Sequence, residues 1–418
     1  MPRHPLPLTA ALACVFASVL AAPAAASNCA GTSTGLVPLN DLGAGFYQGV
    51  QGGLYPGGSN QRPVAHNAAG VAIANAIGPL DTLGVPDAAG KVVFVSIGFS
   101  NATQEFSAFV PKSDADSFRR ANVRTIDCAE GGQTAMILAQ PTSPYWDTVA
   151  TRLRGHGSSP SQVQVAWLKD ANANPTGGFA VNRDSLVAQF FRILQIMKQK
   201  LPNVRLCYMT SRIYAGYAST TLNPEPYAYE NGFAVKQVIE RQLAGDPGLN
   251  FDPASGPVVA PWVAWGPYLW ADGLTPRSDG LTWACSEFST TDGTHPSTSG
   301  RSKVADSLLA FVRADETTVP WYSVTTLAVA PPGGSPATAA GIRAWPNPAR
   351  SRVTFVLPPA ARAVSVRVLD ARGRLVRSLE ASGGRTAWDL RDASGRAVAP
   401  GVYWGVAGAL RTRVVVQR

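Results

Sequence analysis

Short apolar runs alternate with amphipathic stretches through most of the chain. Four runs are short and largely apolar, as buried strands are: 91–97, 122–128, 163–168 and 204–209. A fifth strand is expected at the start of the aromatic stretch 261–273. Helical spacing of apolar residues marks 67–77, 183–201, 233–243 and 299–314. Strands that alternate with helices in this way predict an α/β sandwich with a mainly parallel sheet.

The pattern changes to period two near the C-terminus. Short alternating runs occupy 353–357, 364–369, 375–379, 402–404 and 413–416. Turn-forming residues lie between several of these runs, so we expect a small all-β sandwich over 341–418. The preceding stretch is rich in Thr, Pro, Gly and Ala, and we interpret 319–340 as a linker. The α/β domain then spans 27–318.

The N-terminus has the features of a secretory signal peptide. Arg3 and His4 precede an apolar run over 6–22, and three small alanines end at residue 26, where we expect cleavage. Cys14 offers a second interpretation, a lipoprotein signal, but the apolar run continues well past it. We therefore expect the protein to be secreted, periplasmic or attached to the cell surface.

Composition and charge narrow the classes of partner. The chain has 418 residues, 45% of them hydrophobic and 15% charged, which permits a large core. Its net charge is +9, yet residues 340–418 alone carry +10, from fourteen arginines and four acidic residues. These arginines are spread through predicted strands and are not clustered with aromatic residues, so we expect no nucleic-acid partner. A solvated basic face or attraction to an anionic cell surface remain as interpretations.

Four cysteines follow the signal peptide: Cys29, Cys128, Cys207 and Cys285. In an exported protein they allow two disulfides in any of three pairings, and free buried thiols are the alternative. Their spacing does not suggest a metal site, and we expect neither a metal nor an organic cofactor.

The most informative motif runs from Thr291 to Ser297. It places Asp292 and His295 three residues apart at a tight turn before a predicted helix. There the carboxylate can fix the tautomer of the imidazole and leave its other nitrogen as a base. Ser100 follows a predicted strand, at the sheet edge where α/β folds bind ligands, and is the candidate nucleophile.

These motifs resemble the SGNH (GDSL-like) hydrolase superfamily over roughly 88–315. The resemblance rests on Gly98, Ser100 and Asn101 at the strand end and on the late Asp292 and His295 before the last helix. It implies a flavodoxin-like three-layer sandwich and a serine esterase with Ser100, His295 and Asp292 as its catalytic residues.

The family pattern also implies an oxyanion hole, and here the sequence departs from it. The N–H groups of Ser100 and Gly132 match two donors, with Gly131 as an alternative to Gly132. The usual third donor is an Asn in a Gly-x-Asn-Asp block, which is missing; Asn172 is its nearest equivalent and Lys169 the rival. Phe99 also stands where the family usually has Asp.

Substrate-binding candidates come from two loops expected at the same sheet edge. Arg212 and Tyr214 follow the fourth predicted strand, and Trp265, Tyr268 and Trp270 lie in the aromatic stretch 261–273, where the fifth strand runs into a loop. Exposed aromatic rings beside a cleft would stack on sugars or hold an acyl chain; the alternative is packing beneath the sheet edge.

The C-terminal domain resembles FlgD-like immunoglobulin-type domains and the sorting domains of type IX secretion. The matching residues, in order, are 346–348, Asp370 with 373–374, 388–389 and 400–403. The resemblance implies surface attachment or contact with secretion machinery, and an ordinary accessory domain is the alternative.

Together these features predict a secreted, monomeric serine esterase acting on acylated carbohydrate or other small esters. The contrasting hypothesis is a non-catalytic surface or glycan-binding protein on the same scaffold. The distance from Ser100 Oγ to the nearer nitrogen of His295 discriminates between them: hydrogen-bond reach favours an enzyme, and more than about 6 Å, roughly twice that reach, favours a binder.

Overall fold

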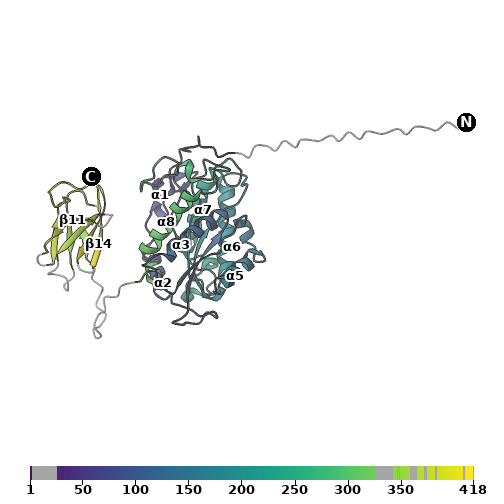
Figure 1. Ribbon diagram of the computed structural model, residues 1–418, viewed down its shortest axis with the longest axis horizontal. Coiled ribbons are helices and arrows are strands. Elements are labelled where there is room, and N and C mark those ends of the chain that lie inside the picture. Colours follow the sequence, from purple (N-terminus) through teal and green to yellow (C-terminus); the bar gives the residue numbers. More distant parts are fainter. Residues whose placement is uncertain are drawn as a thin grey trace. The chain divides into compact units, whose positions relative to one another are not determined.

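The structure is a computed structural model of the whole chain. It describes residues 1, 26–324, 342–345, 347, 349–357, 365–370, 374–381, 384–407 and 410–417. Nearly all of the expected signal peptide, and the expected linker from residue 325 onward, lie outside the described residues. The chain divides into two compact units, Met1–Thr325 and Thr326–Arg418, which we treat separately (Figure 1).

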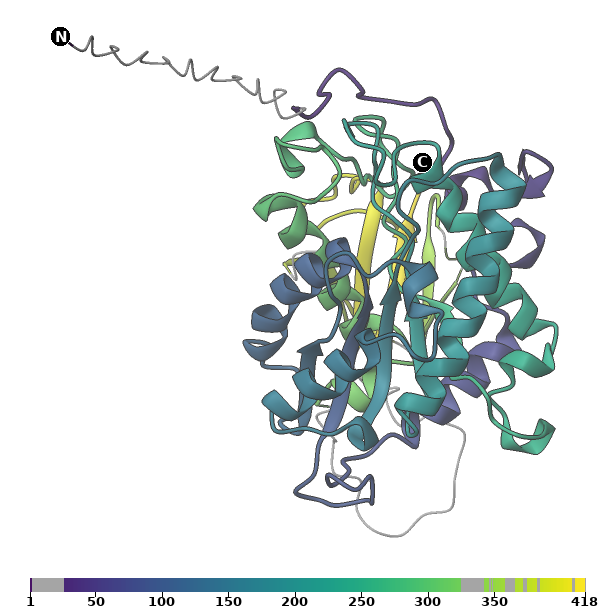
Figure 2. The ribbon, with the colours of Figure 1, turned by 90° about the vertical axis from the view of Figure 1, so that its right-hand side faces the viewer.

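A five-stranded parallel sheet forms the centre of the first unit (Figure 2). Its strands lie in the order β4-β3-β5-β6-β7. Their bounds are Val123–Asp127 for β4, Val92–Gly98 for β3, Val163–Lys169 for β5, Leu206–Met209 for β6 and Trp262–Trp265 for β7. Every residue of β3 and β5 is buried, which explains their continuous apolar sequences. This arrangement confirms the predicted α/β sandwich.

Helices cover both faces of this sheet. The longer ones are α2 (Val64–Asn75), α3 (Ser100–Asp114), α5 (Tyr145–Gly155), α6 (Phe179–Lys200), α7 (Tyr227–Leu243) and α8 (Thr298–Ala314). The chain runs one way from β3 to β4 and the other way from β4 through β7. Right-handed crossovers therefore place α3 and its neighbour α8 on one face, and α6 and α7 on the other (Figure 1).

Shorter elements complete the first unit. They are α1 (Leu39–Leu42), α4 (Ala135–Leu138), α9 (Val319–Tyr322) and the hairpin of β1 (Phe46–Tyr47) with β2 (Val50–Gln51). The linker prediction is corrected at α9, because its residues Trp321 and Tyr322 are buried in the core. Helix α5 was also not expected from the sequence. No described helix is long and apolar enough to cross a membrane.

The second unit consists of two antiparallel sheets. One has the order β11-β10-β13-β14 and the other β12-β9-β8. The bounds are Arg343–Trp345 (β8), Val353–Val356 (β9), Val366–Asp370 (β10), Leu375–Leu379 (β11), Arg385–Trp388 (β12), Gly401–Ala407 (β13) and Leu410–Val416 (β14). Alternate side chains such as Val353, Phe355 and Trp388 enter a core of their own. The predicted all-β sandwich is confirmed, whereas its membership of a sorting family stays a prediction.

One disulfide resolves the pairing that the sequence left open. Cys29 is bonded to Cys285, across 256 positions, while Cys128 and Cys207 are buried free thiols. The bond ties the start of the expected mature chain to the segment just before Asp292. A cross-link that closes so long a loop restricts the unfolded chain strongly.

We therefore predict that Cys29→Ser lowers the free energy of unfolding by about 2–5 kcal/mol, the usual cost of losing a native disulfide. Urea unfolding followed by circular dichroism under oxidising conditions measures it. Cys285→Ser and the double variant should lose the same amount, because all three remove one bond. As a control, the wild-type protein should already show the lowered stability under reducing conditions, and Cys29→Ser should lose nothing further there. An additive loss in the double variant would contradict the prediction.

Candidate active site

Ser100 lies where β3 ends and α3 begins. The strand and helix meet in a sharp turn at Gly98, whose φ of +142° is a backbone conformation that side chains disfavour. A Cβ at Gly98 would lie 1.9 Å from the carbonyl oxygen of Lys169, at the end of the neighbouring strand β5. Glycine therefore allows the two strand ends to approach, and Ser100 becomes the first residue of α3 at the carboxyl edge of the sheet.

Asp292 and His295 lie on one turn before α8. The Asp292 carboxylate accepts hydrogen bonds from the backbone N–H groups of Thr294 and His295, at 2.8 and 3.0 Å. Gly293 sits between them with φ +60°, and a Cβ there would lie 1.8 Å from the carbonyl oxygen of Tyr217. The sequence Asp-Gly-Thr-His thus folds into a turn pressed against the loop after β6.

The structure brings the three predicted catalytic side chains together. His295 Nε2 lies 2.8 Å from Ser100 Oγ, and His295 Nδ1 lies 2.7 Å from Asp292 Oδ2. The side chains of His295 and Asp292 are 22% and 19% exposed, so both remain accessible to solvent. The geometry matches a serine whose proton a carboxylate-oriented imidazole can accept.

The electrostatics keep the orienting carboxylate ionised. Burial opposes ionisation of Asp292, but the hydrogen bonds from His295 and Thr294 outweigh it and lower the pKa of Asp292 below its usual value. An ionised Asp292 accepts a hydrogen bond from His295 Nδ1–H. That fixes the tautomer with a free electron pair on Nε2, which faces Ser100.

Asn101 helps hold the two halves of the site in register. Its side-chain Nδ2 donates to the carbonyl oxygen of Thr294, 3.2 Å away, and so joins helix α3 to the turn that carries His295. Sequence reasoning used Asn101 only as part of a motif. Asn101 and Thr294 are the chain neighbours of Ser100 and His295, so this hydrogen bond helps to fix the distance between Ser100 and His295.

A cavity of about 180 Å³ opens beside Ser100 and His295. Its size is close to that of a 150 Å³ protein cavity known to hold benzene, so it has room for a group of that bulk. Its lining comes from five segments of the first unit: Phe99, Ser100, Asn101, Gly132, Thr134, Asn172, Ala173, Arg212, Leu222, Asn223, Thr294 and His295. The sequence did not single out Thr134, Leu222 or Asn223, which lie in loops without a recognisable pattern.

Two of the predicted oxyanion donors lie in suitable places. The N–H of Ser100 is the first in helix α3 and has no intrahelical acceptor. Gly132 lines the cavity with φ +79°, and within the described residues its N–H has no protein acceptor. A Cβ on the adjacent Gly131 would lie 4.0 Å from the Cβ of Ser100, so this glycine loop borders the nucleophile.

The third donor differs from expectation. Asn172 lines the cavity, but its Nδ2 donates to Gln189 at 2.7 Å and its Oδ1 accepts from the N–H of Met136. The rival, Lys169, is fully buried and donates to both carboxylate oxygens of Glu105, at 2.6 and 2.7 Å. Lys169 is thus occupied by an internal ion pair, and only the second N–H of Asn172 is available for a ligand.

Four of the five predicted substrate-binding residues are corrected. Tyr214, Trp265, Tyr268 and Trp270 are buried, and none of them lines the cavity. Trp265 donates to the carbonyl oxygen of Leu54, and the Tyr268 hydroxyl accepts from the N–H of Leu39. The aromatic stretch therefore packs beneath the N-terminal segment that contains Leu39 and Leu54.

Those four residues share one physical explanation. Trp270 donates to Glu225, and Tyr214 donates to the carbonyl oxygen of Gly31, so the polar atom of each side chain has a hydrogen-bond partner within the protein. Arg212 is the exception among the five, because it does line the cavity.

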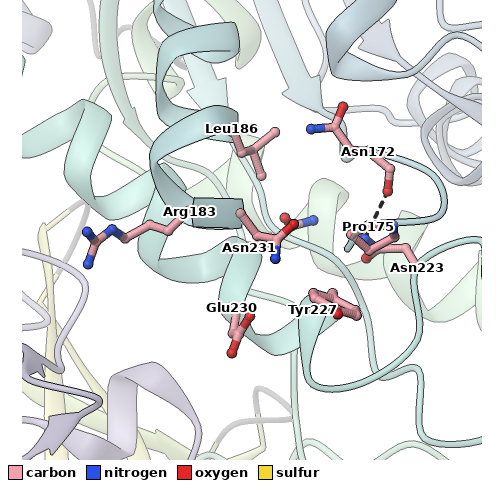
Figure 3. Close-up of a pocket in the computed structure, with 9 residues that line it drawn as sticks. Asn172, Pro175, Arg183, Leu186, Asn223, Tyr227, Glu230 and Asn231 are labelled. Carbon is pink, nitrogen blue, oxygen red and sulfur yellow. Dashed lines mark hydrogen bonds between the residues drawn. The ribbon is translucent and has the colours of Figure 1, made fainter. Parts of the chain in front are cut away.

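A smaller polar pocket adjoins the cavity and shares Asn172 and Asn223 with it (Figure 3). Asn223 Nδ2 donates to the Asn172 carbonyl oxygen at 3.0 Å, as the dashed line in Figure 3 shows. Within the described residues, we find no group of His, Cys, Asp and Glu that could hold a metal ion.

Comparisons with known proteins give only partial matches. No protein-family model and no curated protein matches the chain. Among solved structures, PorZ, a surface component of the type IX secretion system of Porphyromonas gingivalis, matches with 30% identity over 19% of this chain and a TM-score of 0.17. The match spans only 12% of the length of PorZ.

Other solved structures match a larger share of the chain at low identity. A protein described as an acylhydrolase of Bacteroides fragilis is 14% identical, over 62% of this chain and 100% of its own, with a TM-score of 0.31. An extracellular lipase of Streptomyces rimosus is 12% identical, over 53% of this chain and 99% of its own, with a TM-score of 0.29.

Proposed function

We propose that this protein is a serine esterase that hydrolyses small acyl esters. The observation that carries the proposal is the unbroken hydrogen-bonded series from Ser100 Oγ through His295 to Asp292, with 2.8 and 2.7 Å between heavy atoms. The separation is far below the roughly 6 Å, twice hydrogen-bond reach, that would favour a binder without turnover.

In the proposed mechanism, Ser100 Oγ attacks the ester carbonyl carbon while its proton passes to His295 Nε2. The carbonyl oxygen becomes an oxyanion that the N–H groups of Ser100 and Gly132 stabilise, helped by the positive end of helix α3. His295 then returns the proton to the alcohol oxygen as the bond to the carbonyl carbon breaks. A water molecule repeats the sequence, releases the acid and restores Ser100.

The cavity supports the choice of substrate. It borders Ser100 and has a volume of about 180 Å³, which suits a short or ring-sized group better than a long unbranched chain. An acylated carbohydrate remains a proposal, but it loses the support of the aromatic stacking that the sequence suggested, because Trp265 and Trp270 are buried.

We also propose that the protein acts outside the cytoplasm. The N-terminal sequence supports it, and so does the disulfide between Cys29 and Cys285, since such bonds persist in oxidising compartments. The C-terminal β-sandwich would serve attachment or export, a role supported by its sorting-type sequence motifs.

We predict that the purified protein hydrolyses p-nitrophenyl acetate and that Ser100→Ala lowers kcat/KM by at least about 10³, because it removes the nucleophile. The absorbance of the released p-nitrophenol measures the rate. Ser107→Ala, an exposed serine on the same helix, is the matched control and should keep most of the activity. Equal rates for wild type and Ser100→Ala would reject the proposal.

We further predict that Asp292→Asn lowers kcat by about 10³–10⁴ with little change in KM. The Asn side chain would donate to His295 Nδ1 and so place the proton on Nε2, where a base is needed. Steady-state kinetics measure the loss, and thermal unfolding verifies the fold. Asp306→Asn, an exposed residue of α8, is the control and should behave as wild type. A loss of less than tenfold for Asp292→Asn would contradict this role.

A further inference from the structure

Arg212 is a buried cation whose guanidinium lacks a hydrogen-bond partner at two of its three nitrogens in the described part of the chain. Its side chain is 1% exposed, and Nε and Nη2 have no hydrogen-bond partner among the described residues. A buried guanidinium is costly to desolvate, and proteins nearly always pair it with an anion or with several acceptors. An arginine left in this state is therefore a candidate for binding something that arrives from outside the chain.

The position of Arg212 directs it toward the reaction centre. It lines the same cavity as Ser100 and His295. The ring of Phe99 lies beneath its guanidinium, with 5.2 Å between the guanidinium carbon and the ring centroid. An aromatic face holds the guanidinium plane while leaving its edge, with the N–H donors, free for a planar anion.

The nearby carboxylates do not supply that anion. Glu105 accepts with both oxygens from Lys169, and Glu225 accepts from Trp270 and from the N–H groups of Ala215 and Tyr229. Asp292 is taken by the catalytic turn.

Asp170 is the remaining carboxyl group near Arg212. It accepts from the N–H of Ala171, while its other oxygen is buried without a partner. Burial raises the pKa of Asp170 well above its usual value and so disfavours the negative charge that would neutralise Arg212. Burial also lowers the pKa of Arg212, to about 10, which still leaves the guanidinium charged.

We propose that Arg212 forms an anion-binding subsite in the catalytic cavity, and that the preferred substrates are esters carrying a carboxylate or a similar anion close to the scissile bond. The claim that the anion belongs to an ester substrate rests on the proposed function. The claim that Arg212 binds an anion does not depend on it. The anion can belong to the acyl part or to the alcohol part of the ester, and matched substrates distinguish the two.

The test compares kcat/KM for charged esters and neutral isosteres. For the acyl part, the pair is the mono-p-nitrophenyl ester of terephthalate and p-nitrophenyl 4-carbamoylbenzoate. For the alcohol part, the pair is 3-carboxyphenyl acetate and 3-carbamoylphenyl acetate. We expect the charged member of one pair to be favoured by about 10- to 100-fold, the usual worth of a charge-assisted hydrogen bond.

Arg212→Gln should reduce that preference to near unity, and Arg212→Lys should retain part of it, because Lys keeps the charge without the planar fork. Arg241→Gln, an exposed arginine on α7, is the control and should keep the wild-type ratio. Equal rates within both pairs for the wild-type protein, or an unchanged ratio in Arg212→Gln, would overturn the proposal.

A binding measurement separates this proposal from the esterase proposal. Calorimetric titration of the full chain with benzoate should show binding that Arg212→Gln weakens at least about tenfold. Arg212-dependent benzoate binding without turnover of any ester would reject the esterase and retain the anion subsite. Turnover of neutral esters, with neither benzoate binding nor charge preference, would retain the esterase and reject the subsite.

Discussion

The hydrogen bond between Ser100 and His295 joins residues 195 positions apart, and the chemistry proposed for the cavity depends on it. It can form only because two unrelated turns meet at the carboxyl edge of one sheet. Gly98 lets the end of β3 approach the end of β5, and Gly293 lets the turn before α8 press against the loop after β6. At both glycines the neighbouring atom is a backbone oxygen, so repacking of side chains cannot relieve the clash that an added Cβ would cause.

Beneath this edge the protein buries three charged side chains, those of Lys169, Glu105 and Arg212. Lys169 and Glu105 form a fully buried ion pair that satisfies both partners, whereas Arg212 has the charge without the hydrogen bonds. A paired buried charge is structural by default, because removing one partner leaves the other uncompensated. An unpaired one at a cavity wall has a different meaning, since its missing acceptors have to come from outside the chain.

The aromatic stretch after β7 shows where sequence reasoning failed. Trp265 and Tyr268 have the composition of a sugar-binding surface, and the choice between surface and core depends on what covers them. The cover is the N-terminal segment, which supplies the carbonyl oxygen of Leu54 and the N–H of Leu39 as hydrogen-bond partners. That segment is rich in glycine and has little hydrophobic periodicity, so its sequence does not indicate where it packs. Helix α9 was misassigned for the same reason, because Trp321 and Tyr322 follow a polar stretch and are identified as core only by their neighbours.

The sequence alone determined the order of the five strands of the central sheet and of four of the longer helices, the change to a β-rich C-terminal unit, and the local pairing of Asp292 with His295. These features depend on hydrophobic periodicity and on side chains a few residues apart, and both can be read from the local sequence. It also predicted Ser100 as the partner of His295, because strand ends in a parallel sheet share one edge. Only the tertiary structure decided the partner of Cys29, the burial of the aromatic stretch and the isolation of Arg212. Those outcomes depend on which distant segments exclude water from a given side chain, a property of the packed chain and not of any local pattern.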